Sequence, residues 1–500
     1  MPGPFQALPD DVVIYLFDLV SIPDILTLRQ TCKRMQKISG LRIVWTNACN
    51  HQILLPYYPF PKVQIEALTV LELERHVRNA YTLASRWLSP KLISSCIYSD
   101  FDATNGTPVS DLRFVPGYGG NWLLAVSNGI WSIIALWELC DEGRTPIKRW
   151  EWSRRNCTLR SFAMNDDQSS NAILALSVIR GSEFHVETLS LDVETGFRPL
   201  GTIDSALNPI YFHGDILVLC DPIDVSIVTN WKTGASAVLR RPEDASPTDM
   251  SLNDRCIQVV FSADCILVIR ARSLTLFPNP PLTKNFPTTH APLAVHSFGW
   301  VDGVAVTAIV GPNNSSPTSP AQPLSILIRP EPDDPWAATF EHDLDLYVLH
   351  PDPAFPLSST TPYAFPPRHT ARVPSCRGSL QCSDLRLGAH GTAVWVEPQN
   401  RSAVGLLDDV YAPLVRQNER LVCAAFPGPL FRRIVLSPEE EVLDTTPIPV
   451  HGHTLRTNDL NNWKALDYDE VPGRIAVGST RGKITVLSLI PTSTQSPPEV

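Results

Sequence analysis

Several side chains able to do chemistry occur in this sequence, but they do not form a recognisable reactive set. Cys49 and His51 pair a thiol with a base, yet a thiolate nucleophile needs its base within a cleft, and this pair falls where a helix gives way to a loop. His451 and His453 would share one face of a strand, with no third metal ligand beside them. Phosphate-binding glycine loops, nucleophile-elbow motifs and metalloprotease motifs do not occur. We therefore expect a protein that is not an enzyme, with no cofactor and no bound metal.

The cysteines argue against a zinc centre or a disulfide framework. They are odd in number, scattered, and never spaced as Cys-x-x-Cys. The eleven are Cys32, Cys49, Cys96, Cys140, Cys157, Cys220, Cys256, Cys265, Cys376, Cys382 and Cys423. We expect each to be a small buried apolar residue in a reducing compartment. The first residues lack the basic start and apolar core of a signal peptide, so we expect the protein in the cytoplasm and/or the nucleus.

Charge and hydropathy restrict the partners. The formal net charge is −10, so we expect no general attraction to nucleic acid or to acidic lipid. Residues 114–137 carry no charge and are long enough to cross a bilayer as a helix. However, Asn128-Gly129 divides this stretch into two short runs rich in Trp, Ile, Leu and Val, and Asn-Gly is a strong hairpin signal. We interpret the stretch as a β-hairpin and expect no membrane partner.

Short helices are predicted between residues 8 and 45. Pro9 suits a first helical turn, and Asp10 suits the positive end of the helix dipole. From residue 12 to residue 20 the apolar side chains cover nearly the whole circumference, so this helix should be buried on all sides. Pro23 begins a second helix whose apolar positions recur at i, i+3 and i+7. Because a cluster of about 45 residues seldom buries enough of its own surface, we expect a partner to cover part of it.

The order of these residues resembles an F-box, the short helical module that docks a protein onto the Skp-type adaptor of a cullin-RING ubiquitin ligase. The resemblance rests on Leu8-Pro9, the apolar helix after it, Pro23-Asp24-Ile25-Leu26, Thr31-Cys32-Lys33-Arg34 and Trp45. It implies that the adaptor contacts fall on Leu8, Pro9, Val13, Leu16, Ile25, Leu28 and Cys32. Arg29-Gln30-Thr31 departs from the pattern, because many such modules are more apolar there. The alternative is an N-terminal helical cap buried on the rest of the chain.

A spacer and one long helix are expected next. Residues 55–61 contain three prolines and cannot be helical throughout. Thr69 and Glu72 have capping-box spacing, and apolar residues at helical spacing predict a helix from about Thr69 to Leu88. Its polar face holds Glu74, Arg75, Arg78 and Arg86 and is expected to be solvated. We expect this helix to join the first module to the rest without slack.

From about residue 95 the pattern changes to short β-rich runs separated by turns. We predict tight turns at Asn128-Gly129, Arg180-Gly181-Ser182, Cys220-Asp221-Pro222, Arg270-Ala271-Arg272 and Thr480-Arg481-Gly482. Two segments, 191–196 and 229–234, end alike, and their glycines are 38 positions apart, close to the length of a propeller blade, about 40 to 45 residues. Period and turn chemistry resemble degenerate WD-type repeats, although Trp-Asp occurs nowhere.

We therefore predict a mainly β fold, with a C-terminal seven- or eight-bladed β-propeller, a small all-α N-terminal F-box module and a linker helix. The predicted divisions are 1–50 for the F-box module, 51–95 for the spacer and linker helix, 96–490 for the propeller and 491–500 for a disordered tail. Candidate blades lie near 110–141, 157–196, 207–234, 252–278, 293–330, 380–409, 412–444 and 460–490. Proline-rich excursions at 278–292, 311–323 and 350–374 are expected to be surface loops with little structure. A sandwich or two β domains is the alternative architecture.

This arrangement matches that of F-box substrate receptors. The resemblance implies the substrate-recognition subunit of a Skp–cullin–F-box ubiquitin ligase, with a Skp-type adaptor, through it a cullin-RING ligase, and an unknown target protein as partners. The alternative is a non-catalytic propeller scaffold with an F-box-like cap that acts outside any ubiquitin ligase; a propeller hydrolase is disfavoured by the missing motifs. An acidic or phosphorylated target peptide could be held by Arg160, Arg270, Arg272, Arg432 or Arg433, but nothing in the sequence selects them.

Overall fold

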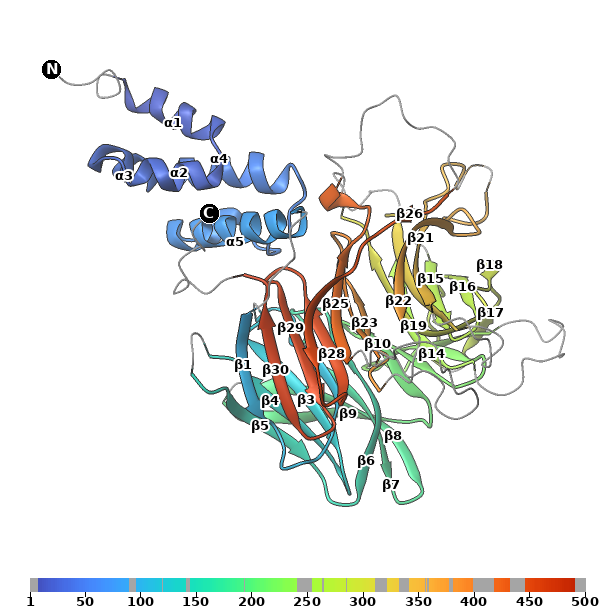
Figure 1. Ribbon diagram of the computed structural model, residues 1–500. Coiled ribbons are helices and arrows are strands. Elements are labelled where there is room, and N and C mark those ends of the chain that lie inside the picture. The colour runs from blue at the N-terminus through green and yellow to red at the C-terminus, as the bar shows by residue number, and fades with distance from the viewer. Residues whose placement is uncertain are drawn as a thin grey trace, which may run out of the picture.

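A small helical module projects from one side of a ring of seven β-sheets in the computed structural model (Figure 1). The structure describes residues 8–490, apart from 90–95, 119, 141–143, 193, 241–253, 263–264, 285, 311–321, 332–340, 356, 358, 377–380, 399–417 and 432–445. The predicted tail, the larger part of the 311–323 excursion, Arg432 and Arg433 lie outside the described residues. Within the described residues, no helix is long and apolar enough to cross a membrane.

The helices begin where local chemistry favours them. They are α1 (Asp10–Leu19), α2 (Ile22–Arg29), α3 (Lys33–Ser39), α4 (Arg42–Ala48), the π-helix η2 (Cys49–Leu54), the 3₁₀-helix η3 (Ile65–Ala67) and α5 (Val70–Trp87). Pro9 precedes α1, and Ser21 caps α2 by accepting from the Asp24 N–H at 3.4 Å. The predicted second helix is divided, because the Thr31 hydroxyl donates to the Leu28 carbonyl at 2.7 Å and Cys32 is extended. Cys32 therefore precedes α3 instead of continuing the apolar face of α2.

Helix α5 confirms the predicted linker helix. The Thr69 hydroxyl accepts from the Glu72 N–H at 3.3 Å, while the Glu72 carboxylate accepts from the Thr69 N–H at 2.8 Å. This reciprocal pair is the predicted capping box. The first half of α5 packs on the helical module and its last turns pack on the ring, so one helix belongs to both cores.

Each sheet of the ring forms one blade, and the structure therefore has seven blades. Blade 1 holds β2 (Val109–Phe114), β3 (Trp122–Asn128), β4 (Ser132–Glu138) and β5 (Ile147–Ser153); blade 2 holds β6 (Cys157–Met164), β7 (Leu174–Arg180), β8 (Glu183–Asp192) and β9 (Gly196–Asp204). Blade 3 holds β10 (Asn208–His213), β11 (Ile216–Cys220), β12 (Ser226–Asn230), β13 (Ser236–Leu239) and β17 (Thr288–His290). Blade 4 holds β14 (Cys256–Ser262), β15 (Cys265–Arg270), β16 (Leu274–Pro278) and β18 (Ala294–His296).

The remaining three blades complete the circle. Blade 5 holds β19 (Trp300–Ala308), β20 (Leu324–Glu331), β21 (Glu341–Leu349), β22 (Arg368–Cys376) and β26 (Ile448–Pro449). Blade 6 holds β23 (Leu385–Leu387), β24 (Thr392–Glu397), β25 (Glu419–Ala425) and β27 (His453–Asn458), with the 3₁₀-helix η4 (Pro429–Phe431) after β25. Blade 7 holds β28 (Trp463–Asp469), β29 (Arg474–Ser479), β30 (Lys483–Ser488) and β1 (Cys96–Asp102). The first strand of the ring thus pairs with the last and closes it.

The structure corrects two parts of the predicted blade pattern. Residues 380–409 and 412–444 were expected to form separate blades, but β24 and β25 pair side by side in blade 6. The ring therefore has seven blades and not eight. The prediction split blade 6 because a long connection separates β24 from β25 in the sequence. The excursions at 278–292 and 350–374 also contribute β17, at the edge of blade 3, and the first part of β22, between β21 and β26 in blade 5. Proline-rich composition therefore did not exclude strand pairing.

The five predicted tight turns lie on one face of the ring. Each joins the second and third strands of its blade, in blades 1, 2, 3, 4 and 7. We call this side, defined by the turns at residues 129–131, 181–182, 221–225, 271–273 and 480–482, the open face. Helix α5 packs on the other side, where Leu83 contacts Gly473 in the turn between β28 and β29. In Figure 1 the helices and the open face are accordingly at opposite ends.

The two segments with similar endings occupy equivalent turns, between the third and fourth strands of blades 2 and 3. Asp192 accepts from the Glu194 N–H at 2.8 Å, and Asn230 accepts from the Lys232 N–H at 3.1 Å. Both turns end in a glycine with positive φ. The repeat read from the sequence is therefore a repeat of turn geometry.

Candidate functional site

The helical module has a closed core of its own. Its buried residues include Val13, Phe17, Ile25 and Trp45, and the residues that complete it come from α5. Those α5 residues are Leu73, Val77 and Ala80. Among the described residues, none from the ring belongs to this cluster. The module is therefore covered by the linker helix and not by the β body, unlike a cap buried on the rest of the chain.

One face of α1 nevertheless remains uncovered. Val12, Tyr15 and Leu19 are 38%, 63% and 65% exposed, and their spacing places them on one side of the helix. Val13 and Phe17, on the opposite side, are buried. The sequence predicted that the chain alone would not cover this helix and that a partner would cover part of it. The structure leaves an apolar stripe open, and we call Val12, Tyr15 and Leu19 the α1 stripe.

The seven predicted adaptor contacts divide into two groups. Pro9 and Cys32 are exposed, and three leucines are half-buried: Leu8, Leu16 and Leu28. Val13 and Ile25 are instead sealed within the module core, so they support the surface from beneath. For the accessible five, contact with an adaptor stays a prediction. The α1 stripe was missed, because an apolar run that covers a whole helix does not indicate which side faces outward.

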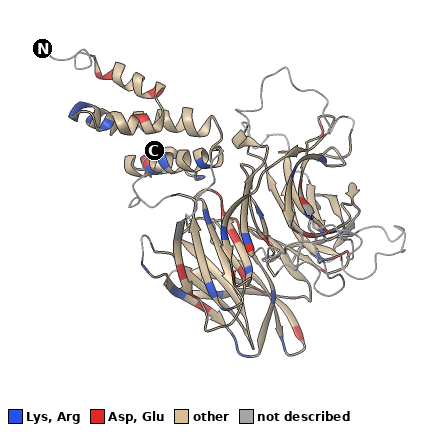
Figure 2. Ribbon diagram, viewed as in Figure 1, with Lys and Arg blue, Asp and Glu red and all other residues tan. Residues whose placement is uncertain are grey.

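Polar contacts from Arg34 hold the backbone just before α1, where Leu8 and Pro9 lie. Arg34 donates to the Leu8 carbonyl and pairs with Asp10 at 2.6 Å. Arg34 lies in α3 with Lys33 and Lys37, and Figure 2 shows the basic residues gathered at this end of the module. A side chain of α3 thus fixes the backbone that precedes α1.

The polar face of α5 is solvated only in part: Arg75 and Arg78 are exposed as expected, but Glu74 is buried. Arg29 pairs with the buried Glu74 through two hydrogen bonds of 2.7 and 2.9 Å and lies over the Trp45 ring at 5.5 Å. Arg78 approaches the same carboxylate at 3.5 Å. The departure of Arg29 from the apolar pattern is explained by this pair, since it connects α2 to the linker helix.

The far end of α5 is fixed to blades 6 and 7. Leu83, Ala84 and Trp87 belong to the apolar cluster between these blades. A Cβ atom on Gly473 would lie 2.8 Å from the Leu83 side chain, so the contact requires glycine, which also has a φ of +63°. Arg86 donates to the Leu489 carbonyl at the end of the ring. The helical module and the ring are therefore joined through one continuous helix.

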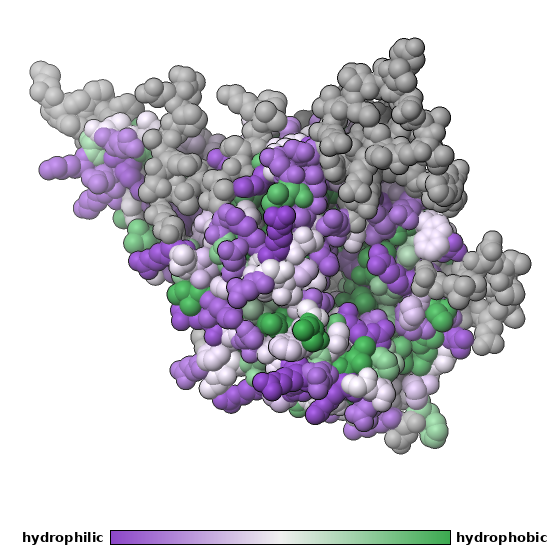
Figure 3. Space-filling model, turned by 60° about the horizontal axis from the view of Figure 1, so that its bottom comes forward, coloured by the Kyte–Doolittle hydropathy of each residue, from purple (hydrophilic) through white to green (hydrophobic). Residues whose placement is uncertain are grey.

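The open face carries exposed apolar side chains on three consecutive blades. Ile130, Phe184 and Ile223 lie in or beside the turns of blades 1, 2 and 3, and they are 93%, 42% and 51% exposed. Figure 3, which turns the lower side of Figure 1 forward, shows hydrophobic residues scattered among hydrophilic ones. This face has the composition of a surface able to contact a protein.

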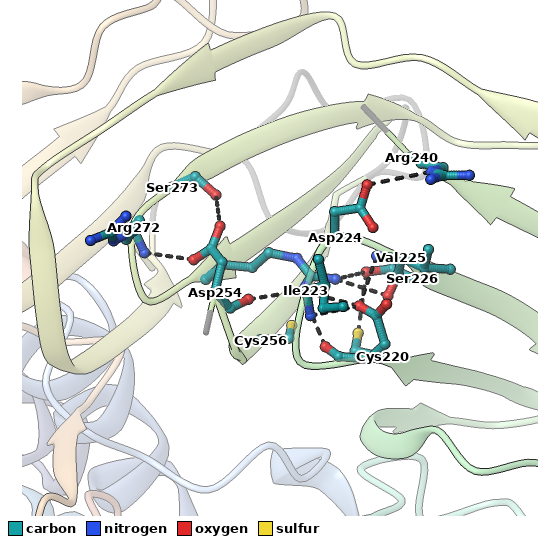
Figure 4. Close-up of polar contacts among 12 residues, drawn as sticks. Cys220, Ile223, Asp224, Val225, Ser226, Arg240, Asp254, Cys256, Arg272 and Ser273 are labelled. Atoms are coloured by element: carbon teal, nitrogen blue, oxygen red, sulfur yellow. Dashed lines mark hydrogen bonds and ion pairs between the residues drawn. The ribbon is translucent and has the colours of Figure 1, made fainter. Parts of the chain in front are cut away.

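The candidate arginines of this face are already engaged. Arg160 donates to the Ala206 carbonyl at 2.9 Å and lies over Phe184, and Arg272 lies over the Trp300 ring at 3.7 Å. Arg270 is buried and donates to three backbone carbonyls and to the Ser226 hydroxyl at 2.8 to 3.1 Å (Figure 4). Arg270 therefore joins blade 3 to blade 4 and is not accessible to a ligand.

Among the described residues no group of three His, Cys, Asp or Glu side chains is placed to hold a metal ion. His390 and Glu470 form a buried pair at 2.9 Å, and Glu470 also accepts from Thr392 at 2.5 Å. These residues connect blade 6 to blade 7. The geometry indicates a structural contact between blades.

Comparison with known protein families identifies the first part of the chain. Residues 5–51 match the family model of F-box-like domains. The crystal structure of the β-propeller domain of Cps50 (Swd1) from Myceliophteria thermophila is similar to 79% of this chain and is covered over 99% of its own length, with 9% sequence identity and a TM-score of 0.42. No curated protein matches the chain. The chain thus carries an F-box-like domain followed by a seven-bladed β-propeller.

Proposed function

We propose that this protein is the substrate-recognition subunit of a Skp–cullin–F-box ubiquitin ligase. The helical module docks on a Skp-type adaptor, and the open face of the propeller binds the target protein. The observation that carries the proposal is the α1 stripe: an F-box-like domain with a closed core leaves Val12, Tyr15 and Leu19 uncovered. An exposed apolar helix face of this kind favours burial against a partner.

In this proposal the chain itself makes and breaks no bonds. It raises the effective concentration of target lysines near the ubiquitin carrier, which is a positioning effect. The opposite placement of the α1 stripe and the open face (Figure 1) supports this role, because two partners can be bound without overlap. We place the protein in the cytoplasm or the nucleus, where such ligases act.

Co-purification with a Skp-type adaptor tests the docking step. We expect stable capture of the adaptor by the full chain, and strong loss of capture in Leu19→Gln, because the glutamine cannot replace the apolar contact. Leu71→Gln is the matched control, since Leu71 is 79% exposed on α5 and lies outside the α1 stripe. A Leu8→Ala, Pro9→Ala double variant should also lose capture. Helix content from circular dichroism should be the same in all variants.

Two results would reject the proposal. One is the absence of capture by the unaltered chain. The other is capture that is equal in Leu19→Gln, Leu71→Gln and the double variant. Either would favour the alternative, a propeller scaffold that acts outside any ubiquitin ligase.

A further inference from the structure

Two cysteines from neighbouring blades meet beneath the open face. Cys220 ends β11 in blade 3, and Cys256 begins β14 in blade 4. Both belong to the apolar cluster between these blades, where Cys220 is buried and Cys256 is half-buried. Their side chains lie next to each other in Figure 4, where Cys220 also reaches the labelled Ser226.

The surroundings favour a thiolate at Cys220. Its thiol donates to Ser226 Oγ at 3.2 Å, and the same oxygen accepts from Arg270 at 3.1 Å. After ionisation the Ser226 hydroxyl can rotate to donate to the sulfur while it keeps the Arg270 bond. Hydrogen bonds from Cys256 and Ser226 and the nearby guanidinium lower the pKa of Cys220, although burial opposes this shift.

Other buried thiols have different surroundings. Burial alone raises the pKa of Cys49 to about 11 and raises the pKa of Cys423 as well. A thiol that stays protonated is a poor nucleophile. Cys220 therefore combines a lowered pKa and a hydroxyl bonded to Arg270 with a second cysteine in the same blade interface.

We propose that Cys220 and Cys256 are a reversible oxidation site at which a hydroperoxide forms a disulfide between blades 3 and 4. The Cys220 thiolate attacks one oxygen of hydrogen peroxide, the O–O bond breaks, and hydroxide leaves and takes up a proton to become water. The Cys256 sulfur then attacks the resulting sulfenic acid, the S–O bond breaks, and a second water leaves with the Cys256 proton. Two thiols are oxidised and one peroxide is reduced to two waters.

The bond acts on the open face. Residues 221–225 form its blade 3 turn, directly after Cys220, and the Asp221 and Val225 carbonyls of this turn already accept from Arg270 at 3.1 and 2.8 Å. A disulfide at the base of the turn fixes it to blade 4. Reduction by an external thiol returns the two free cysteines.

Peptide mapping of the full chain tests the site. The folded protein is treated with hydrogen peroxide, alkylated, and digested without reductant. We expect a linked pair of peptides that contains Cys220 and Cys256, a protein mass lower by two hydrogen atoms, and reversal by dithiothreitol. Cys256→Ser should stop at a Cys220 sulfenic acid that dimedone labels. Cys382→Ser, which removes another buried thiol, should leave the linked pair unchanged.

The proposal has clear opposing outcomes. A folded protein that yields no linked pair would overturn it, as would a pair that forms only after denaturation or that links Cys220 to another cysteine. Ser226→Ala should slow disulfide formation by about tenfold, the effect of raising a pKa by one unit. An unchanged rate in a folded Ser226→Ala protein would show that the Ser226 hydroxyl does not assist the thiolate.

Discussion

Arg29 connects three helices of the module through one guanidinium group. It pairs with Glu74 of α5 at 2.7 Å, donates to the Ser39 hydroxyl of α3 at 3.0 Å and lies over the Trp45 ring of α4. Glu74 is only 7% exposed, so its carboxylate has little contact with water and is hydrogen-bonded by this partner. A buried ion pair adds little net stability, but the loss of one member is costly.

We therefore expect Arg29→Met to lower the free energy of unfolding by about 3 kcal/mol, because Glu74 keeps a buried charge with only the more exposed Arg78 beside it. Adding Glu74→Leu should restore most of the loss. Urea unfolding, followed by the near-ultraviolet signal of the tryptophans, measures both variants. Arg75→Met is the control, since Arg75 is exposed on the same helix. A double variant no more stable than the single one would contradict this account.

At the residue scale, the sequence predicted which family the helical module resembles, but it did not predict which side chains are buried and which are exposed. The order from Leu8 to Trp45 was sufficient to identify an F-box-like domain. It could not show that Val13 faces the core while Val12 faces outward, because both lie in a run that is apolar on every side. That choice depends on where α4 and α5 pack. The role of Arg29 was hidden for the same reason, since Glu74 is 45 residues away.

Strand β28 ends at Asp469, close to the turn that contacts α5, and the pKa of this carboxyl group is raised. Burial, with the nearby Asp467 carboxylate, raises the pKa of Asp469 from 3.8 to about 6. A raised pKa means that the folded state binds the proton more tightly than the unfolded state does. The stability from this proton is complete below about pH 4 and is lost as the pH rises through about 6.

Asp469→Asn should therefore stabilise the protein at pH 8 by about 1–2 kcal/mol and have no effect near pH 4. The asparagine keeps the shape of the protonated carboxyl group and never acquires its charge. Thermal unfolding at both pH values measures the difference. The control is Asp102→Asn, a substitution of the same kind at an exposed site at the end of β1. An equal effect of Asp469→Asn at both pH values would mean that packing, not ionisation, governs the site.

The polar contacts between blades differ around most of the ring. Ser132 accepts from the Leu159 N–H between blades 1 and 2, and Gln258 exchanges two hydrogen bonds with Val306 between blades 4 and 5. One contact does recur, since an aspartate accepts a backbone N–H both between blades 6 and 7 and between blades 7 and 1. Because this contact does not mark every interface, turn chemistry was the readable signal. It located five turns of the open face correctly, but it divided blade 6 in two.

The ring as a whole is held by apolar contacts between neighbours. A separate buried cluster lies at each of the seven blade interfaces. In such a ring every blade is covered on both sides only when the last interface is closed. Closure comes from β1, which pairs with β30 from Cys96–Ser488 to Asp102–Lys483. This pairing could not be predicted from the sequence, since the partners Asp100 and Thr485 are 385 residues apart.

Removing β1 should therefore affect the entire molecule and not only its own strand. A chain that begins at residue 103 leaves the backbone groups of β30 unpaired at a sheet edge, and edges of this kind promote association between chains. We expect it to form dimers and larger species and to unfold over a broad transition. A chain that begins at residue 69 keeps α5 and β1 but loses the helices that cover Leu73 and Val77 in the full chain. With Leu73→Gln and Val77→Gln in place of these newly exposed apolar side chains, it should stay monomeric and unfold in one transition. Light scattering and urea unfolding separate the two cases. If the chain from residue 103 were as monomeric and cooperative as the longer one, β1 would be a peripheral strand, and the seventh interface alone would have to close the ring.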